Sequence, residues 1–491
     1  MKISSAFFTA VLSLAALGCV SGSAQASPWA EVGDNQLRAD IQLLAAAGVV
    51  DDVTTHWPLP WYAVIADIDA AALDGLPVSV RLAATRVLTR ARAETADGTS
   101  ASLYLDATNK PSLVYGFDGM GRGKGQAQLS LGGTGGAFSG RLALGAFSQD
   151  LSGKTTKVMP EGTYMSARLG DALIYAGYLD HWWGPGQISA LSFSNNARPM
   201  PQVGIQRADT SPSTLPVVRW LGPWQFEFLL GYLDGPRIQP DTYYAAFRFT
   251  FSPTFLPGLE IGLARTEQFC GEGHPCVPLR DYFHFSNNPL STNATNDQGL
   301  MDFKYSGQIG ELPFQAYVQF MNEDYSPIKY SGTSHLVGAS VFIPTWENPV
   351  KLTVEYTSSI ATRDIFSFGT YRYGFTYNNY AFPDGMRYRG RTLGFSLDND
   401  STLLSLQGGW TDSSTDRFYQ LSLHQARVGS NRSLGFNVLS PTPVLVNMAE
   451  ARMTLPWNGL KLDLAGRLQD DQPRPSRGFA AGIEVALRMD L

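Results

Sequence analysis

Apolar and polar residues alternate with a period of two over most of the chain, from about Leu103 to the C-terminus. The clearest runs are 224–232, 243–251, 314–320, 352–356, 460–464 and 483–491. Alternation of this kind predicts β-strands with one apolar face. Glu227 and Arg248 stand among aromatic residues in the first two runs. Because charged residues at such positions cannot face lipid, we expect them to face the inside of a barrel.

The segment before these strands has a helical period. Leu37, Ile41 and Leu44 recur three or four residues apart, behind Asp34 as an N-cap and ahead of Gly48 as a stop. A second helix is expected over roughly 78–93, and the Trp-Pro-Leu-Pro-Trp sequence at 57–61 predicts a rigid connector between the two. The second helix carries four arginines, Arg81, Arg86, Arg90 and Arg92. They form either a docking face for acidic partners or, as we favour, an ordinary solvated helix face.

The first residues have the pattern of a secretory signal. Met1 and Lys2 precede an apolar run over 6–17, and small residues then lead to Ala26. This predicts a signal peptide over 1–26 that is cleaved after Ala26. Cleavage before Cys19, which would leave a lipidated cysteine, is the weaker alternative because Ala16 replaces the usual leucine. The remaining chain then divides into a periplasmic helical domain, 27–96, and a barrel domain, 97–491.

Composition separates a membrane barrel from a soluble β-protein. Only 16% of the 491 residues are charged, whereas soluble proteins carry about 25%. After the signal, no apolar run approaches the ~18 residues that a spanning helix needs. The other structure that satisfies every backbone group in lipid is a closed barrel. We therefore predict a mainly β protein of the outer membrane, a transmembrane antiparallel β-barrel. No repeat of blade length supports the competing soluble sandwich or propeller.

The length of the predicted barrel sets its width. About 390 residues at ~20–24 per strand and connection give roughly 16–18 strands, and an even number is expected. Such a barrel holds an open pore unless something fills it. The segments 182–202, 269–298 and 366–391 make poor strands, so they are our candidates for loops that occlude the lumen. The formal net charge of −6 argues against nucleic acid as a partner.

Two cysteines follow the predicted signal peptide, Cys270 and Cys276. They flank Gly-Glu-Gly-His-Pro, a loop-like composition, so an exported protein is expected to join them in a disulfide. Zinc bound by both cysteines and His274 is the alternative. It lacks an evident fourth ligand, and tetrahedral sites need four ligands or three with a water.

Two groups of motifs resemble a known family. The first is Asp-His-Trp-Trp-Gly-Pro-Gly at 180–186, followed by Ser-Asn-Asn-Ala-Arg-Pro at 194–199. The second is Tyr-Arg-Tyr-Gly at 371–374, followed by Asp-Gly-Met-Arg-Tyr-Arg-Gly-Arg at 384–391 and Ser-Leu-Asp-Asn-Asp at 396–400. Both resemble the Wzi-type capsule-assembly proteins. The resemblance implies an outer-membrane barrel of about eighteen strands, a periplasmic helical bundle and loops that occlude the lumen. It also implies a lectin-like protein that attaches capsular or exopolysaccharide to the cell surface and assists capsule assembly.

These motifs contain side chains that suit glycan recognition. Trp182 and Trp183 could stack on sugar faces, and the polar members could hydrogen-bond hydroxyls or pair with uronate carboxylates. The polar candidates are Asn195, Asn196, Arg198, Arg387, Tyr388, Arg389 and Arg391. The alternative is that these groups satisfy one another inside the barrel as a plug, because buried polar networks need many partners.

Two other functions compete with glycan attachment. A polar lumen would suit a porin-like channel for small polar or glycan-derived solutes, although the loop candidates oppose it. A hydrolase or acyltransferase needs a nucleophile beside a base, but none of the six histidines lies in such a motif and no Gly-x-Ser-x-Gly elbow occurs. His424 is expected to point into the lumen as part of a polar network. We expect no enzyme activity, no cofactor and no metal.

The expected partners follow from the predicted location. They are capsular or exopolysaccharide, outer-membrane lipid and, through the helical domain, the polysaccharide export machinery. A monomer is expected, because a barrel of this size closes on itself.

Overall fold

A computed structural model describes residues 26–150, 158–274, 276, 295–323, 332–343, 348–367, 369–430, 437–457 and 459–491. The predicted signal peptide therefore lies outside the described residues, apart from Ala26, as does most of the lumen-loop candidate at 269–298. No helix in the described part of the chain is both long and apolar enough to span a bilayer.

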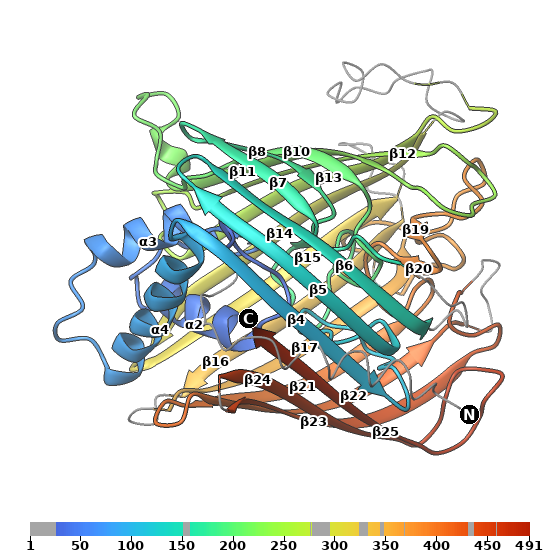
Figure 1. Cartoon of the computed structure of the whole chain (residues 1–491). Coiled ribbons are helices and arrows are strands. Elements are labelled where there is room, and N and C mark those ends of the chain that lie inside the picture. The colour runs from blue at the N-terminus through green and yellow to red at the C-terminus, as the bar shows by residue number, and fades with distance from the viewer. Residues whose placement is uncertain are drawn as a thin grey trace.

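The described strands form a closed antiparallel barrel of 18 strands, as the alternation predicted (Figure 1). Its first strands are β4 (Gly98–Thr108), β5 (Gly123–Gly135), β6 (Phe138–Asp150), β7 (Tyr164–Leu169), β8 (Ala172–Gly177), β10 (Gln202–Arg207), β11 (Trp224–Tyr232), β12 (Tyr243–Phe251) and β13 (Leu259–Phe269). The others are β14 (Thr295–Ile309), β15 (Leu312–Glu323), β16 (Thr333–Ile343), β17 (Val350–Thr362), β21 (Thr402–Asp412), β22 (Arg417–Val428), β23 (Val444–Trp457), β24 (Leu460–Gln469) and β25 (Ala480–Asp490). The barrel closes where β25 pairs with β4, with Leu487 opposite Leu105. Two-residue β18 (Tyr371–Arg372) extends the edge of β17.

The two faces of the wall differ as the period of two requires. Glu227 and Arg248 are fully buried and point inward, whereas Leu421 and Leu423 on the outer face are about half exposed, at 55% and 48%. The outer apolar face is the surface that lipid covers in outer-membrane barrels. His424 lies on the inner face of β22, where its Nδ1 is 2.7 Å from the Ser405 hydroxyl.

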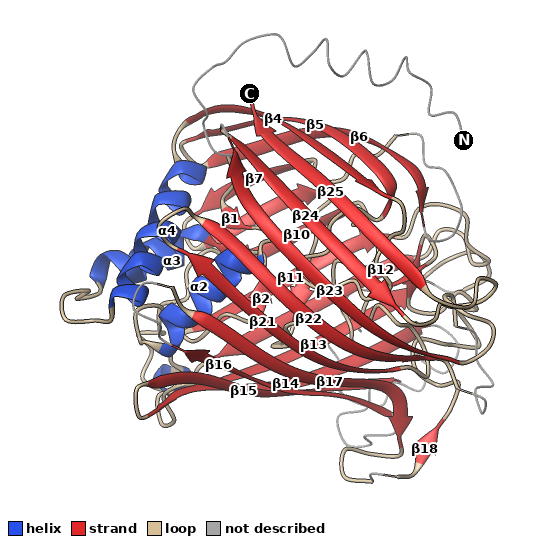
Figure 2. Cartoon of the chain, turned by 90° about the horizontal axis from the view of Figure 1, so that it is seen from below, coloured by secondary structure: helices blue, strands red, loops and turns tan. Residues whose placement is uncertain are grey.

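Three helices cover one end of the barrel (Figures 1 and 2). They are α2 (Asn35–Ala46), α3 (Trp61–Ala70) and α4 (Val78–Thr95). The Asp34 side chain caps α2 by accepting a hydrogen bond from the Leu37 amide at 3.0 Å, as predicted. Helix α3 was not predicted separately, because the sequence suggested only a connector around its first residue, Trp61.

Two of the arginines of α4 form ion pairs that are partly buried. Arg86 pairs with Asp40 at 2.7 Å, and Arg90 pairs with Asp34 at 2.6 Å and with Glu94 at 2.8 Å. Charges that are neutralised in this way are poor attractors for an acidic partner. The structure therefore argues against the docking interpretation of these arginines.

The connections at the two ends of the barrel differ in length. At the helical end, β5 and β6 are joined by residues 136–137, and β7 and β8 by residues 170–171. At the other end, β8 and β10 are separated by residues 178–201, and β17 and β21 by residues 363–401. Outer-membrane barrels have short periplasmic turns and longer outer loops, so the expected orientation places the helices in the periplasm and the long loops at the extracellular mouth.

The loop that follows β13 contains the two cysteines. Cys270 and Cys276 are joined as a disulfide, with their Cα atoms 4.2 Å apart. Neither sulfur is then available as a thiolate, so the alternative of zinc bound with His274 is withdrawn.

Candidate glycan-binding site

The long loops turn into the lumen and fill it. The segment 178–201 runs across the inside of the barrel, and its two-residue strand β9 (Trp182–Trp183) pairs with β2 (His56–Trp57) from the helical domain. The segment after β17 adds a small hairpin of β19 (Arg387–Tyr388) and β20 (Arg391–Thr392). We call these two segments, together with residues 109–122, the plug. The sequence predicted the first two parts of it, but not the part at 109–122.

Trp182 and Trp183 lie at the centre of the plug with no exposed surface. The Trp182 indole donates a hydrogen bond to the Gly186 carbonyl at 3.0 Å. Its ring packs edge-on against Phe117, with the ring centroids 5.6 Å apart. Trp183 packs edge-on against Phe193, with the ring centroids 5.1 Å apart. No sugar can reach either ring, so the prediction that they stack on a glycan is not supported, and the alternative of a packed plug describes them.

A carboxylate on the wall joins the plug to the helical domain. Glu227 of β11 accepts hydrogen bonds from His56 at 2.7 Å, His181 at 3.0 Å and the Tyr175 hydroxyl at 2.6 Å. His56 comes from the helical domain and His181 from the plug, so one side chain holds both against the wall. Burial lowers the pKa of the His56 imidazole, although its hydrogen bond to Glu227 opposes this. The sequence predicted that Glu227 faces inward, but not which groups it binds.

A second wall carboxylate holds the plug by its backbone. Glu355 of β17 accepts hydrogen bonds from the amides of Gln187 at 2.5 Å and Ser189 at 2.7 Å, and from the Tyr317 hydroxyl at 2.8 Å. Backbone amides of a buried loop need such partners, because no water replaces them. The turn at 186–189 is therefore fixed to the wall.

The polar residues of the two motifs largely satisfy one another. The Asn195 side chain donates to the Phe117 carbonyl at 3.0 Å, and the Asn196 side chain donates to the Thr392 carbonyl at 2.9 Å. Arg391 donates to the Asn196 side chain at 3.3 Å and to the Arg122 carbonyl at 3.0 Å. All of these side chains are buried. Their prediction as direct glycan contacts is not supported, because their hydrogen-bonding groups are directed into the plug.

Arg387 and Arg198 are also engaged in ion pairs. Arg387 lies 2.7 Å from Asp398, which is fully buried, and Arg198 pairs with Glu161, which also lies near Arg122. A buried arginine beside a buried carboxylate is typical of a structural pair. These two arginines therefore stabilise the structure of the plug, although Arg387 also lines a cavity described below.

Tyr388 and Arg389 connect the plug with the mouth of the barrel. The Tyr388 hydroxyl and the Arg389 guanidinium both bind Asp234, the latter at 2.7 Å. Tyr388 is buried, whereas 28% of the Arg389 side chain is exposed. Arg389 has a positive φ of 49°, and its Nε donates a hydrogen bond to the Tyr388 hydroxyl at 3.0 Å. Among the nine predicted glycan residues, Arg389 is the one with a substantial surface at the mouth.

A cavity of about 820 Å³ opens at this mouth. Its charged lining residues are Lys110, Arg237, Asp384, Arg387, Arg389 and Arg474. Five prolines, Pro111, Pro236, Pro383, Pro473 and Pro475, also line it. Arg387 and Arg389 are already paired with Asp398 and Asp234. The other three cations, Lys110, Arg237 and Arg474, outnumber Asp384, so the cavity is attractive to anions. Prolines restrict the backbone of the walls, so less conformational freedom is lost when a ligand binds.

Arg237 is positioned by the motif at 384–391, and part of its guanidinium group has no hydrogen-bond partner in the described part of the chain. Its Nη1 donates to the Arg387 carbonyl at 2.6 Å, and the amide of the next residue, Ile238, donates to the Asp384 carboxylate at 2.7 Å. Its Nε and Nη2 atoms are buried and have no hydrogen-bond partner in the described part of the chain. Burial lowers the pKa of this guanidinium, because no carboxylate adjoins it closely enough to compensate fully. A ligand carboxylate in the cavity would supply the missing acceptor.

The comparisons with known proteins agree with this architecture. The profile of the family described as "Capsule assembly protein Wzi" matches residues 96–468. This chain belongs to the Wzi family. Membership confirms the resemblance that the motifs at 180–186 and 384–391 predicted.

Two known proteins are similar to this chain, one in sequence and one in structure. An uncharacterized 55.8 kDa protein in the cps region of Klebsiella pneumoniae is 27% identical over 312 residues, which are 62% of this chain and 60% of that protein. A solved structure of Wzi from Escherichia coli is described as an outer-membrane, carbohydrate-binding β-barrel involved in group 1 capsule assembly. It superposes with a TM-score of 0.81 at 20% identity, over 94% of this chain and 98% of that one. This structural likeness shows the shared fold, and it agrees with an outer-membrane location.

Sequence reasoning missed Lys110, Arg237 and Arg474, which line the cavity from three different loops. Each of them is adjacent to a proline, in Lys110-Pro111, Pro236-Arg237 and Pro473-Arg474. A basic residue held beside a proline in a long outer loop is the signal that could have found them. The signature motifs drew attention to the plug instead, because their aromatic and amide residues are more distinctive.

Proposed function

We propose that this protein attaches an acidic capsular or exopolysaccharide to the outer surface of the cell, by binding its carboxylates in the basic cavity at the mouth. The observation that carries the proposal is Arg237, which lines this basic cavity and has two nitrogens without a hydrogen-bond partner in the described part of the chain. The capsule-assembly description of the family supports it, as does the description of the Escherichia coli barrel as carbohydrate-binding.

In this proposal the cavity residues and the plug residues have separate roles. Arg237, Arg389, Arg474 and Lys110 contact the glycan, because each presents a cationic group to the cavity. Arg387 and its partners are positioning residues, since the Arg387 carbonyl fixes the Arg237 guanidinium. The two tryptophans and the asparagines of the plug support this arrangement from below. The function is binding without a chemical step, and it requires neither metal nor cofactor.

The remaining partners are proposals of the same kind. The N-terminal segment is proposed to act as a signal peptide and the helical domain to meet the export machinery, whose glycan product must reach the mouth. A monomer is the proposed state, because the wall closes on itself without a second chain. A porin-like channel is not proposed, because the plug fills the lumen.

The proposal is tested by deleting the gene and measuring cell-attached and shed polysaccharide. Complementation uses the wild type, an Arg237→Ala/Arg474→Ala double variant, and an Arg372→Ala control. Arg372 is exposed at the same end of the barrel but does not line the cavity. We expect the deletion to move polysaccharide into the medium, and the control but not the double variant to restore attachment. Unchanged attachment in the deletion strain would contradict the function, and full rescue by the double variant would contradict the site.

A further inference from the structure

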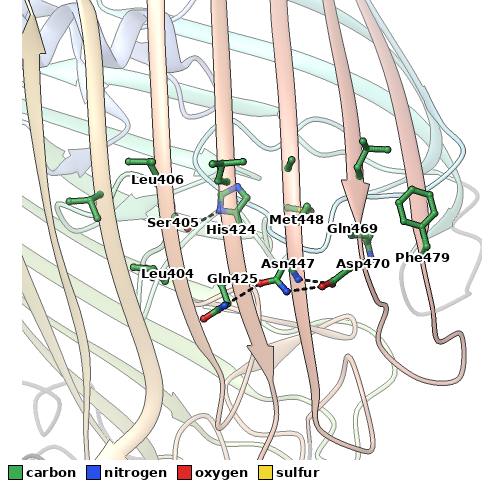
Figure 3. A pocket seen from close by; sticks show the side chains of 14 residues that line it. Leu404, Ser405, Leu406, His424, Gln425, Asn447, Met448, Gln469, Asp470 and Phe479 are labelled. Atoms are coloured by element: carbon green, nitrogen blue, oxygen red, sulfur yellow. Dashed lines mark hydrogen bonds between the residues drawn. The ribbon is translucent and has the colours of Figure 1, made fainter.

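The outer wall of the barrel carries a groove near its extracellular end. It crosses β17 and β21 to β24 and has a volume of about 650 Å³ (Figure 3). Apolar side chains form most of its surface, including Leu404, Leu406, Leu423, Ala449, Leu468 and Phe479. It lies on the lipid-facing surface and is separate from the glycan cavity inside the mouth.

The groove results from one small residue in a row of leucines. The strand register places Leu406 beside Leu423, Leu423 beside Ala449, and Ala449 beside Leu468. Leu423 and Leu468 are 48% and 55% exposed, so both project from the wall. Ala449 has only a methyl group between them, which leaves a slot that runs along the strands. A slot of this shape suits a single acyl chain.

A row of polar side chains closes the extracellular end of the slot (Figure 3). The Gln425 amide donates to the Asn447 side chain at 3.1 Å, and the Asn447 amide donates to Asp470 at 2.6 Å. Their neighbours His424 and Ser405 bond to each other and belong to the inner face. Polar side chains in a row on the outer face are costly within hydrocarbon, so this row marks the level of the lipid headgroups.

A cation lies one step beyond this row. Arg427 follows Gln425 on the same outward face of β22, pairs in register with Leu445, and is exposed. No ion pair joins Arg427 to a carboxylate in the described parts of the chain. The Asp470 carboxylate is already bonded twice by Asn447, through its backbone amide at 2.8 Å and its side chain at 2.6 Å.

We propose that this groove binds one phosphorylated lipid of the outer leaflet. An acyl chain lies over Ala449 between Leu423 and Leu468, and the phosphate accepts hydrogen bonds from the Gln425 amide and the Arg427 guanidinium. The occupant is a membrane lipid because the exposed leucines that form the groove stand on the lipid-facing side of the wall. It belongs to the outer leaflet because the polar row lies at the extracellular end of the strands.

The test compares two tryptophan variants that differ only in their place along β23. Ala449 lines the groove, whereas Ala451 points outward one step nearer the periplasm and does not line it. The detergent-solubilised protein is titrated with purified lipid A and bound lipid is counted by native mass spectrometry. We expect saturable binding of one lipid by the wild type and by Ala451→Trp, and at least about tenfold weaker binding by Ala449→Trp, which corresponds to ~1.4 kcal/mol. Ala449→Leu, a smaller change on the lipid face, should weaken binding in the same direction.

A second comparison tests the headgroup. The Gln425→Leu/Arg427→Leu double variant should lose affinity for lipid A while binding diacylglycerol, which has no phosphate, as the wild type does. Equal binding of lipid A by the Ala449→Trp and Ala451→Trp variants would overturn the proposed slot. Equal binding of lipid A and diacylglycerol by the wild type would overturn the phosphate site and leave only unspecific lipid contact. Both outcomes are independent of whether the mouth binds a glycan.

Discussion

Two sets of arginines in this barrel lie close together and have different surroundings. In the plug, Arg387 and Arg391 are buried and their guanidinium groups bind a carboxylate, an amide or backbone carbonyls. At the mouth, Arg237 keeps two nitrogens without partners and Arg474 is exposed beside the cavity. In the proposed function, the distinctive motifs therefore serve the structure of the plug, while the groups that bind the glycan come from less distinctive loops.

The largest effect on stability is expected from replacing a buried arginine of the plug. Arg387→Ala leaves the Asp398 carboxylate buried without its cation, which costs about 3–5 kcal/mol. We expect the plug to loosen, with a lower urea midpoint in tryptophan fluorescence, because Trp182 and Trp183 lie in the plug. Arg389→Ala is the matched control, since its pair with Asp234 is partly exposed and contributes about 1 kcal/mol or less. Equal midpoints for the two variants would contradict the assignment of Arg387 to the structure.

The next effect concerns the mouth arginines and separates affinity from stability. Arg237→Ala removes the donors for a ligand carboxylate, and a charged hydrogen bond contributes about 1.5–3 kcal/mol. We expect the Kd for a uronate-containing oligosaccharide to rise at least about tenfold, while the urea midpoint of the plug stays unchanged. Arg237→Lys should retain part of the affinity because it keeps the charge but not the planar donors. A large loss of stability without loss of affinity would reverse the two roles.

A smaller effect concerns the stability of the helical domain, which we expect to depend on pH. In the helical domain, burial raises the pKa of Asp67 to about 7 and that of Asp40 to about 6, the latter despite its hydrogen bond to Arg86. The folded domain then binds protons more tightly than the unfolded chain, so these groups reduce its stability as the pH rises from about 4 to 7. We expect slower proteolysis of the helical domain at pH 5 than at pH 8, with a smaller difference in Asp67→Asn. The opposite order, or an unchanged difference in the variant, would contradict this assignment.

The smallest effect is expected where an arginine is both paired and exposed. Arg92 of α4 lies 2.6 Å from Asp69, but the two side chains are 59% and 44% exposed. Such surface pairs contribute about 0–1 kcal/mol. Arg92→Ala should change neither glycan binding nor the rate of proteolysis measurably. A clear loss of polysaccharide attachment in this variant would instead revive the idea that α4 docks an acidic partner.

The sequence predicted the barrel well, because the alternation that identifies a strand is local to that strand. Alternation in 224–232 and 243–251 sets which residues face lipid, and a strand needs no knowledge of its partner to show that period. The Asp34 cap was predictable for the same reason. The site was not, since the cavity joins Lys110, Arg237 and Arg474 from three loops far apart in the chain.

The motif residues allow two uses, and the reason is physical. Trp182, Trp183 and Asn196 have the chemistry that binds sugars, and the same chemistry fills a wide lumen with packed rings and satisfied amides. Only burial and partner atoms separate the two uses, and neither is written in a single sequence. The inward direction of Glu227 was predictable from the period, but its bonds to His56 and His181 depend on the docked helical domain.

The most direct test of the account is the binding of a uronate-containing oligosaccharide to the purified barrel, measured beside the same oligosaccharide with its carboxyl groups reduced. We expect the wild type to prefer the acidic form and the Arg237→Ala/Arg474→Ala variant to lose this preference. We also expect Arg372→Ala to retain the preference and added salt to weaken it, because the attraction is between charges. Equal binding of the acidic and the reduced forms by the wild type would contradict the claim that the unpartnered mouth arginines recognise the glycan.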